Sequence, residues 1–75
     1  PASDFVKIRM KEQPSGYVQI RIVDLFGRTV YNSIEIYSEQ VNEKTIDCSS
    51  FPNGFYSTVL TYNNKNECMP LVISK

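Results

Sequence analysis

Acidic side chains are the main candidates for chemistry in this chain of 75 residues, because it contains no histidine. Histidine is the commonest general base and metal ligand, and serine or cysteine nucleophiles usually depend on it for activation. Two carboxylates could act as a glycosidase-type pair if the fold brought them together. A domain this small, however, has little room for a substrate cleft of about 300 Å³. We therefore expect no catalysis and no cofactor. The carboxylates are scattered along the chain at Asp4, Glu12, Asp24, Glu35, Glu39, Glu43, Asp47 and Glu67.

The tyrosines are the second set of side chains with a candidate binding role. Their rings could stack on sugars or bases, but tyrosine is also a favoured strand residue that packs its ring and keeps its hydroxyl in water. Lys+Arg 8 balances Asp+Glu 8, which argues against a phosphate-binding face and against nucleic acid as a partner. We interpret Tyr56 as a core residue and the others as strand surface, with glycan binding as the alternative. The set is Tyr17, Tyr31, Tyr37, Tyr56 and Tyr62.

Apolar residues that recur with a period of two predict an all-β fold. They alternate with polar residues from Val6 to Met10 and from Val18 to Ile22, as in strands with one face on a core. Residues 34–37 either continue the third strand or begin another, and residues 38–44 are expected to be a surface connection. About seven short strands suit a small antiparallel Ig-like β-sandwich. The remaining predicted strands begin at Val30 or cover residues 45–48, 55–62 and 68–74.

Length and hydropathy predict a single domain over residues 1–75. The core of such a short chain is marginal. No apolar run approaches the roughly 20 residues of a membrane helix, so we expect a chain that does not span a membrane. No signal peptide begins at Pro1, and we expect the chain to be a piece of a larger protein.

Two segments carry the residues of tight turns. Pro52 presets φ for the second position of a turn, Asn53 suits the third, and Gly54 can take a positive φ. In Asp24-Leu25-Phe26-Gly27-Arg28, the aspartate is expected to accept hydrogen bonds from N–H groups of the turn, and the arginine either to cover the hairpin or to pair with the aspartate.

These turn segments also carry a resemblance to a known family. The chain reads Ile46-Asp47-Cys48-Ser49-Ser50-Phe51-Pro52-Asn53-Gly54-Phe55-Tyr56, and upstream Val23-Asp24-Leu25-Phe26-Gly27-Arg28. These stretches resemble the I-D-L-S-x-L-P-x-G-x-Y and Y-D-L-x-G-R signatures of the type A C-terminal sorting domain of the type IX (Por) secretion system. Pro1-Ala2-Ser3 is similar to the end of the family's N-P-x-S opening, and Val72-Ile73 stands at its last apolar pair, so the resemblance covers nearly the whole chain.

The resemblance implies a secretion signal with an Ig-like sandwich fold. Such a domain sits at the carboxyl end of a cargo that folds in the periplasm and is taken through the outer membrane by the type IX translocon. A surface sortase then removes the domain, at a point upstream of Pro1, and joins the cargo to a lipopolysaccharide, which leaves the cargo at the cell surface. The implied partners are an outer-membrane shuttle and the sortase.

The same resemblance suggests which residues the export machinery reads. A purely structural role in the turns is the alternative for Gly27 and Arg28, and also for Pro52 and Gly54. Pro70 cannot donate to a ladder and predicts that the last strand lies at a sheet edge or contains a bulge. That edge could pair with a second copy or with the shuttle. The candidate recognition residues are Gly27, Arg28, Pro52, Gly54, Leu71, Val72, Ile73 and Lys75.

Cys48 and Cys68 allow three interpretations. Each could be a small buried apolar residue, which is favoured for Cys48 because the family usually has leucine there. Export through the periplasm, implied by the resemblance, permits a disulfide worth about 3 kcal/mol if the Cα atoms lie within about 7 Å. A two-cysteine metal site without histidine is the third.

One departure from the family leaves other functions open. Members often carry basic residues through the last strand, whereas residues 69–74 are uncharged and Lys75 alone follows. The first alternative is therefore a domain retained at the surface that binds lipopolysaccharide or a machinery subunit. The second is an Ig-like spacer or adhesion module without a role in export.

Overall fold

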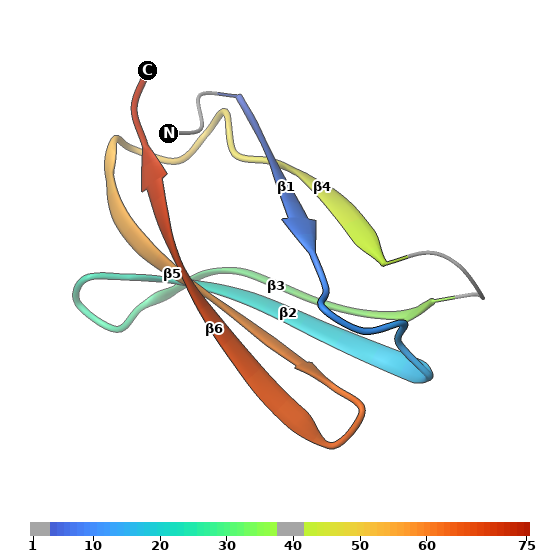
Figure 1. Ribbon diagram of the computed structural model, residues 1–75. Coiled ribbons are helices and arrows are strands. Elements are labelled where there is room, and N and C mark those ends of the chain that lie inside the picture. The colour runs from blue at the N-terminus through green and yellow to red at the C-terminus, as the bar shows by residue number, and fades with distance from the viewer. Residues whose placement is uncertain (1–3, 38–41) are drawn as a thin grey trace.

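The computed structural model describes residues 4–37 and 42–75, which form two antiparallel sheets (Figure 1). One sheet has two strands in the order β1-β4, and the other has four in the order β3-β2-β5-β6. The predicted all-β sandwich is confirmed, with six strands because residues 34–37 continue the third one. The strands are β1 (Phe5–Arg9), β2 (Gly16–Asp24), β3 (Thr29–Tyr37), β4 (Glu43–Asp47), β5 (Gly54–Tyr62) and β6 (Lys65–Ile73).

The four-stranded sheet is built from two hairpins that join through β2 and β5. In the second hairpin, Asn63 and Asn64 have φ values of 52° and 60°, and Tyr62 pairs directly with Lys65. A two-residue turn with two positive φ values matches the twist of the flanking strands. Pairing therefore begins at once, and β6 starts three residues earlier than the sequence predicted.

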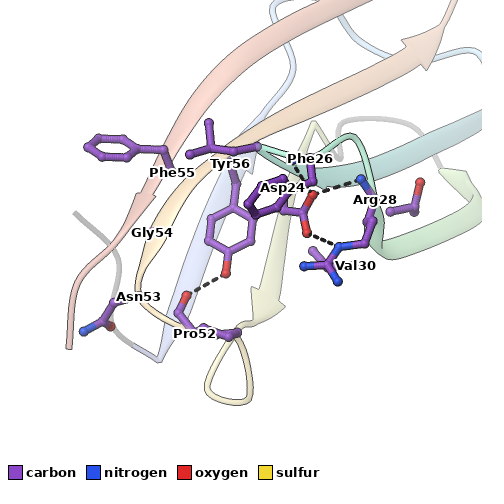
Figure 2. A pocket seen from close by; sticks show the side chains of 11 residues that line it. Asp24, Phe26, Arg28, Val30, Pro52, Asn53, Gly54, Phe55 and Tyr56 are labelled. Atoms are coloured by element: carbon purple, nitrogen blue, oxygen red, sulfur yellow. Dashed lines mark hydrogen bonds and ion pairs between the residues drawn. The ribbon is translucent and has the colours of Figure 1, made fainter.

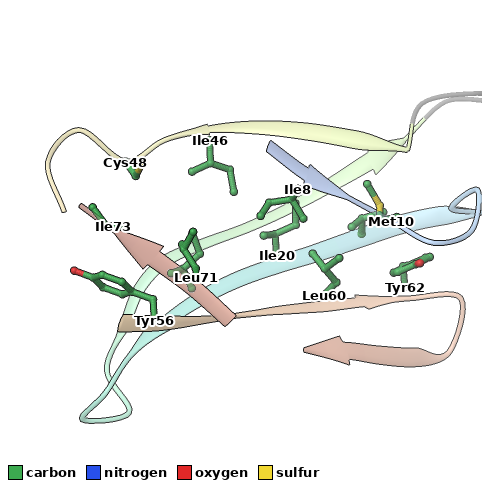
Figure 3. Packing of buried hydrophobic residues seen from close by; sticks show 12 residues of the cluster. Ile8, Met10, Ile20, Ile46, Cys48, Tyr56, Leu60, Tyr62, Leu71 and Ile73 are labelled. Carbon is green, nitrogen blue, oxygen red and sulfur yellow. The ribbon is translucent and has the colours of Figure 1, made fainter. Parts of the chain in front are cut away.

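The core lies between the two sheets (Figure 3). Alternate side chains of each strand point inward, so β2 contributes Val18, Ile20 and Ile22. Burying such side chains contributes about 25 cal/mol per Å² of apolar surface. The small sheet contributes Ile8 and Ile46, which lie above this face. The two layers therefore share one continuous apolar core.

Tyr56 is a core residue, as predicted, but Tyr62 is not strand surface. Residues 56, 58, 60 and 62 share one face of β5, and Tyr62 is only 2 % exposed. Its hydroxyl donates to a carboxylate oxygen of Glu67 at 2.6 Å, and burial is the main reason that the pKa of Tyr62 is raised. Tyr31 also packs against the core. Tyrosine is common on strand surfaces, but the phase of the strand decides on which side each ring lies.

Backbone hydrogen bonds extend the β1–β4 ladder at both of its ends, and an ion pair attaches this small sheet to β3. The backbone N–H of Met10 donates to the carbonyl of Asn42 at 2.8 Å, and that of Cys48 to the carbonyl of Asp4 at 2.8 Å. Lys44 belongs to β4, not to a surface connection, and its ammonium lies 2.7 Å from a carboxylate oxygen of Glu35 in β3. Glu43 also belongs to β4, and residues 38–41 of the expected connection lie outside the described part of the chain.

The last strand lies at an edge of the four-stranded sheet, as Pro70 predicted. Pro70 sits opposite Ser57, and the register of β5 and β6 runs through this pair without a shift. The edge position therefore accommodates the proline, and no bulge is needed. The two ends of this four-stranded sheet are β3 and β6.

Candidate functional site

The two signature turns meet at one end of the sandwich and line an open pocket of about 460 Å³, which is larger than we expected of so small a domain (Figure 2). Pairing of β2 with β5 causes this meeting, because it sets Asp24 opposite Tyr56. The β2–β3 turn then lies beside the connection from β4 to β5. The lining residues are Asp24, Leu25, Phe26, Arg28, Thr29, Val30, Pro52, Asn53, Gly54, Phe55 and Tyr56.

The first turn is organised by Asp24. One carboxylate oxygen accepts the N–H groups of Phe26 and Arg28, both at 2.9 Å, and the other accepts the guanidinium of Arg28 at 2.8 Å. The hydrogen bond from the Arg28 backbone is the main reason that the pKa of Asp24 is lowered. Gly27 has a φ of 83°, a conformation that favours glycine. The predicted role of Asp24 is confirmed, and of the two local roles open to Arg28 the structure shows the pairing with Asp24.

The second turn is closed partly by a core side chain. Its first residues are held by a local hydrogen bond, in which Ser49 donates its N–H to the Asp47 carboxylate at 2.9 Å. Hydrogen bonding from Ser49 is also the main reason that the pKa of Asp47 is lowered. Further on, the hydroxyl of Tyr56 donates to the carbonyl of Pro52 at 2.6 Å. Gly54 has the predicted positive φ, but its value of 158° lies next to the extended region. A side chain at Gly27 would therefore strain the backbone more than one at Gly54.

Lys75 ties the described end of the chain to this second turn. Its ammonium donates to the carbonyl oxygens of Ser49 and, at 2.6 Å, of Phe51. Its backbone N–H donates to the side-chain oxygen of Asn53 at 3.0 Å. The positive charge of Lys75 also contributes to the lowered pKa of Asp47. Three candidate recognition residues, Lys75, Pro52 and Gly54, are thus brought to the same end as Gly27 and Arg28.

The apolar candidates of the last strand divide between two faces. Leu71 and Ile73 point into the core and are 8 % and 1 % exposed. Val72 points outward, is 37 % exposed and pairs with the exposed Phe55. Leu71 and Ile73 are therefore placed to hold the fold, and Val72 is the member of this group that a partner can touch.

Sequence reasoning missed the apolar tip formed by Leu25 and Phe26. These side chains are 73 % and 83 % exposed, and the guanidinium of Arg28 lies 5.5 Å from the centre of the Phe26 ring. Tight turns usually carry glycine, proline and short polar residues. Two large apolar residues in a turn are a signal that the sequence alone could have given.

The two cysteines do not form a disulfide, and they lie on opposite faces of the four-stranded sheet. Cys48 is fully buried in the core, as the interpretation as a small apolar residue requires. Cys68 is exposed and lies opposite Val59, on the outward face of β6. Cys68 therefore points away from the core that holds Cys48. Within residues 4–37 and 42–75, no group of three or more potential ligands could hold a metal ion.

Residues 1–74 match the family model of the secretion system C-terminal sorting domain. The chain belongs to this family. The match covers both signature turns and all of β6, so the sorting domain is a signal domain of the type IX system. Its family is not an enzyme family, and membership implies interaction with the secretion system and export to the cell surface or the medium. No curated protein and no solved structure matches the chain. In the part that the structure describes, no helix has the length and apolarity to cross a bilayer.

Proposed function

We propose that residues 1–75 form the C-terminal module of a larger cargo and act as its outer-membrane export signal. The cargo reaches the periplasm first, passes through the type IX translocon, and is attached to the cell surface by a sortase that cuts upstream of Pro1. The observation that carries this proposal is the pocket at which both signature turns meet, with Lys75 bound to one of them.

The shape and chemistry of this pocket suit capture by an outer-membrane shuttle. Phe26 and Phe55 are strongly exposed beside it, so a partner could bury them and gain about 25 cal/mol per Å². The side chain of Arg28 is 74 % exposed while its Nε holds Asp24, so its remaining N–H groups can reach an acceptor on the partner. Recognition would thus combine an apolar anchor with a charge-assisted hydrogen bond.

A reporter fused ahead of the sorting domain tests this proposal in a type IX-competent cell. The wild-type fusion is expected at the surface, whereas Arg28→Ala is expected to lower export with little loss of stability. Arg9→Ala is a matched control, because Arg9 is 75 % exposed and also forms a single 2.8 Å ion pair, but in the other sheet. Wild-type reporter that stays in the periplasm, while an established member of the family exports it, would refute the proposal.

The same experiment addresses the retained module, which is our second candidate. The observation in its favour is that Lys75 is engaged with the second turn and no other basic residue follows Lys65. A retained domain would bind lipopolysaccharide or a machinery subunit. Exported reporter that keeps the mass of the whole fusion supports retention, whereas reporter shortened by the domain supports sortase processing. A spacer or adhesion module would leave the reporter in the periplasm.

A further inference from the structure

The backbone of β3 offers an open edge, and its direction follows from two independent observations. The N–H of Asp24 donates to the carbonyl of Arg28, on the β3 side of β2. In an antiparallel strand, alternate residues direct both backbone groups to the same neighbour. β2 pairs with β5 without a shift from Gln19 to Asp24, and with β3 without a shift from Gly16 to Ile22. The backbone N–H and carbonyl groups of Val18, Ile20 and Ile22 therefore also point toward β3.

In β3, the residues opposite these three direct their backbone N–H and carbonyl groups toward β2. The residues between them direct these groups away from β2. Ser33 and Glu35 lie opposite Ile20 and Val18. The N–H and carbonyl groups of Asn32, Ile34 and Ile36 therefore point away from β2, where the described part of the chain places no strand. Pro70 supports this assignment. The same alternation, continued through β5 to β6, predicts that the backbone groups of residue 70 point away from β5. A proline is tolerated there, because the N–H that it lacks would not bond to β5.

The side chains around the β3 edge are unusually apolar for a surface. Ile34 and Ile36 are 63 % and 69 % exposed, and Tyr17, which pairs with Ile36, is 66 % exposed. Glu35 is the only charged residue of β3, and it points inward to the ammonium of Lys44. The edge thus lacks the lysines, prolines and outward charges that usually block pairing.

The other edge strand, β6, is less able than β3 to pair with an added strand. The outward backbone positions of β6 are Asn66, Cys68, Pro70 and Val72, and Pro70 supplies no N–H in the middle of this row. An added strand would leave one of its acceptors without a donor there. Self-association through the last strand stays a prediction, but β3 has the more continuous edge.

We propose that β3 is a self-association edge, at which a second copy of this chain adds its own β3 in antiparallel register. In the register centred on Ile34, every residue whose backbone groups point outward has a partner. Ile34 lies opposite Ile34 of the second copy, and Asn32 lies opposite Ile36. It also places Glu35 opposite Ser33. A register centred on Glu35 would set two carboxylates against each other, which is unfavourable. The product is a two-fold dimer with one sheet that runs continuously through both copies.

The amino-acid sequence of β3 favours a second copy of this chain as the partner at this edge. Under the two-fold, each exposed isoleucine meets an apolar or neutral side chain, and no charged side chain lies on the outward face of β3 at the contact. The dimer does not depend on the export function, since it requires only the edge. An extended segment of an unrelated protein at this edge is the competing outcome.

Sedimentation across a concentration series of the 75-residue chain tests the proposal. We expect a reversible dimer, and we expect Ile34→Lys to raise its dissociation constant by at least about tenfold, because two ammonium groups would face each other. Ile34→Pro should do the same by removing an outward N–H, as Pro70 does on β6. The matched control is Val72→Lys, which charges the other edge strand at an exposed position and should leave the dimer intact.

Thermal unfolding and circular dichroism of each variant verify that the fold is kept. A wild-type chain that is monomeric throughout the series would overturn the proposal, even if an unrelated strand were found at this edge. A dimer that persists in both Ile34 variants, or one that Val72→Lys dissociates, would overturn it as well.

Discussion

The first turn is held by atoms within five residues of one another, whereas the second also depends on Lys75, which lies beyond β6. The carboxylate of Asp24 alone accepts three hydrogen bonds in the first turn. The second turn has a local hydrogen bond as well, from Tyr56 to Pro52, but it is also held by Lys75 from beyond β6. One side of the pocket can therefore form with its hairpin, and the other requires the finished sheet.

Removal of residues 70–75 is the strongest test of this dependence. The deletion takes away Lys75 and two core side chains, Leu71 and Ile73, each worth about 2–5 kcal/mol. A domain of this size has a total stability of only about 5 kcal/mol or a little more, so we expect a chain that no longer folds and a fused cargo that is not exported. Circular dichroism and the export assay measure the two effects.

Val72→Ala is the control for this deletion, because Val72 is partly exposed and its truncation should leave a cooperative unfolding transition. A truncated domain that still folds and exports at the normal rate would show that the second turn does not need β6.

Gly27→Val tests the self-contained turn. No atom lies within 4 Å of a Cβ built on Gly27, so the expected cost of about 1–2 kcal/mol comes from the backbone conformation alone. Gly54→Val is the matched control and should cost less, because a φ of 158° is close to extended. Denaturant unfolding measures both. Equal costs would mean that the two glycines do not differ in the way their φ values indicate.

Acid should weaken the first turn through Asp24. The pKa of this carboxyl is lowered in the folded chain, mainly by the hydrogen bond from the Arg28 N–H. Its stabilisation is therefore complete above the unfolded pKa, near 3.9, and is lost as the pH falls through the folded pKa. Asp24→Asn should melt earlier than wild type at neutral pH.

The difference between the two proteins should begin to shrink below about pH 4 and vanish as the pH falls through the lower pKa of the folded wild-type carboxyl. The pKa values of Glu12, Glu43 and Asp47 are also lowered, mainly by hydrogen bonds from Lys65, Arg9 and Ser49, so both proteins lose stability in acid. Melting temperatures from neutral pH to pH 2 measure the difference. A constant gap would exclude the charge of Asp24 as its cause.

Lys75→Met should have the smallest effect on overall stability, below about 1 kcal/mol. The backbone bond to Asn53 remains, and the bonds to the carbonyls of Ser49 and Phe51 are lost. We expect faster amide hydrogen exchange in residues 49–53 and unchanged exchange at Gly27. Lys11→Met, at another exposed lysine, is the control. Equal acceleration in both turns would contradict the separate support of the second one.

Features set by neighbouring residues could be predicted from the sequence. The period of two located most strands, and the side chains of Asp24 and Arg28 specified the first turn. Pro70 identified an edge strand from the chemistry of one residue. These predictions succeeded because their physical causes act over a few residues.

Features set by distant pairing could not be predicted in this way. The alternation in β3 does not reveal that Ile34 and Ile36 face outward, because a shift in the β2–β3 register leaves Val30 out of the ladder and sets the phase of the rest. The contact of Lys75 with the turn requires that β6 already lies beside β5. Pairing of β1 with β4 likewise joins segments that no local signal relates.

The position of Lys75 also has a consequence for the order in which the molecule is made. A ribosome releases β6 after every other strand, and Lys75 later still. Until then, β5 lacks its outer neighbour and the Ser49–Gly54 turn lacks the ammonium that binds two of its carbonyls. A product of interrupted translation that ends before Lys75 therefore carries both signature stretches in its sequence but does not assemble them into the complete surface.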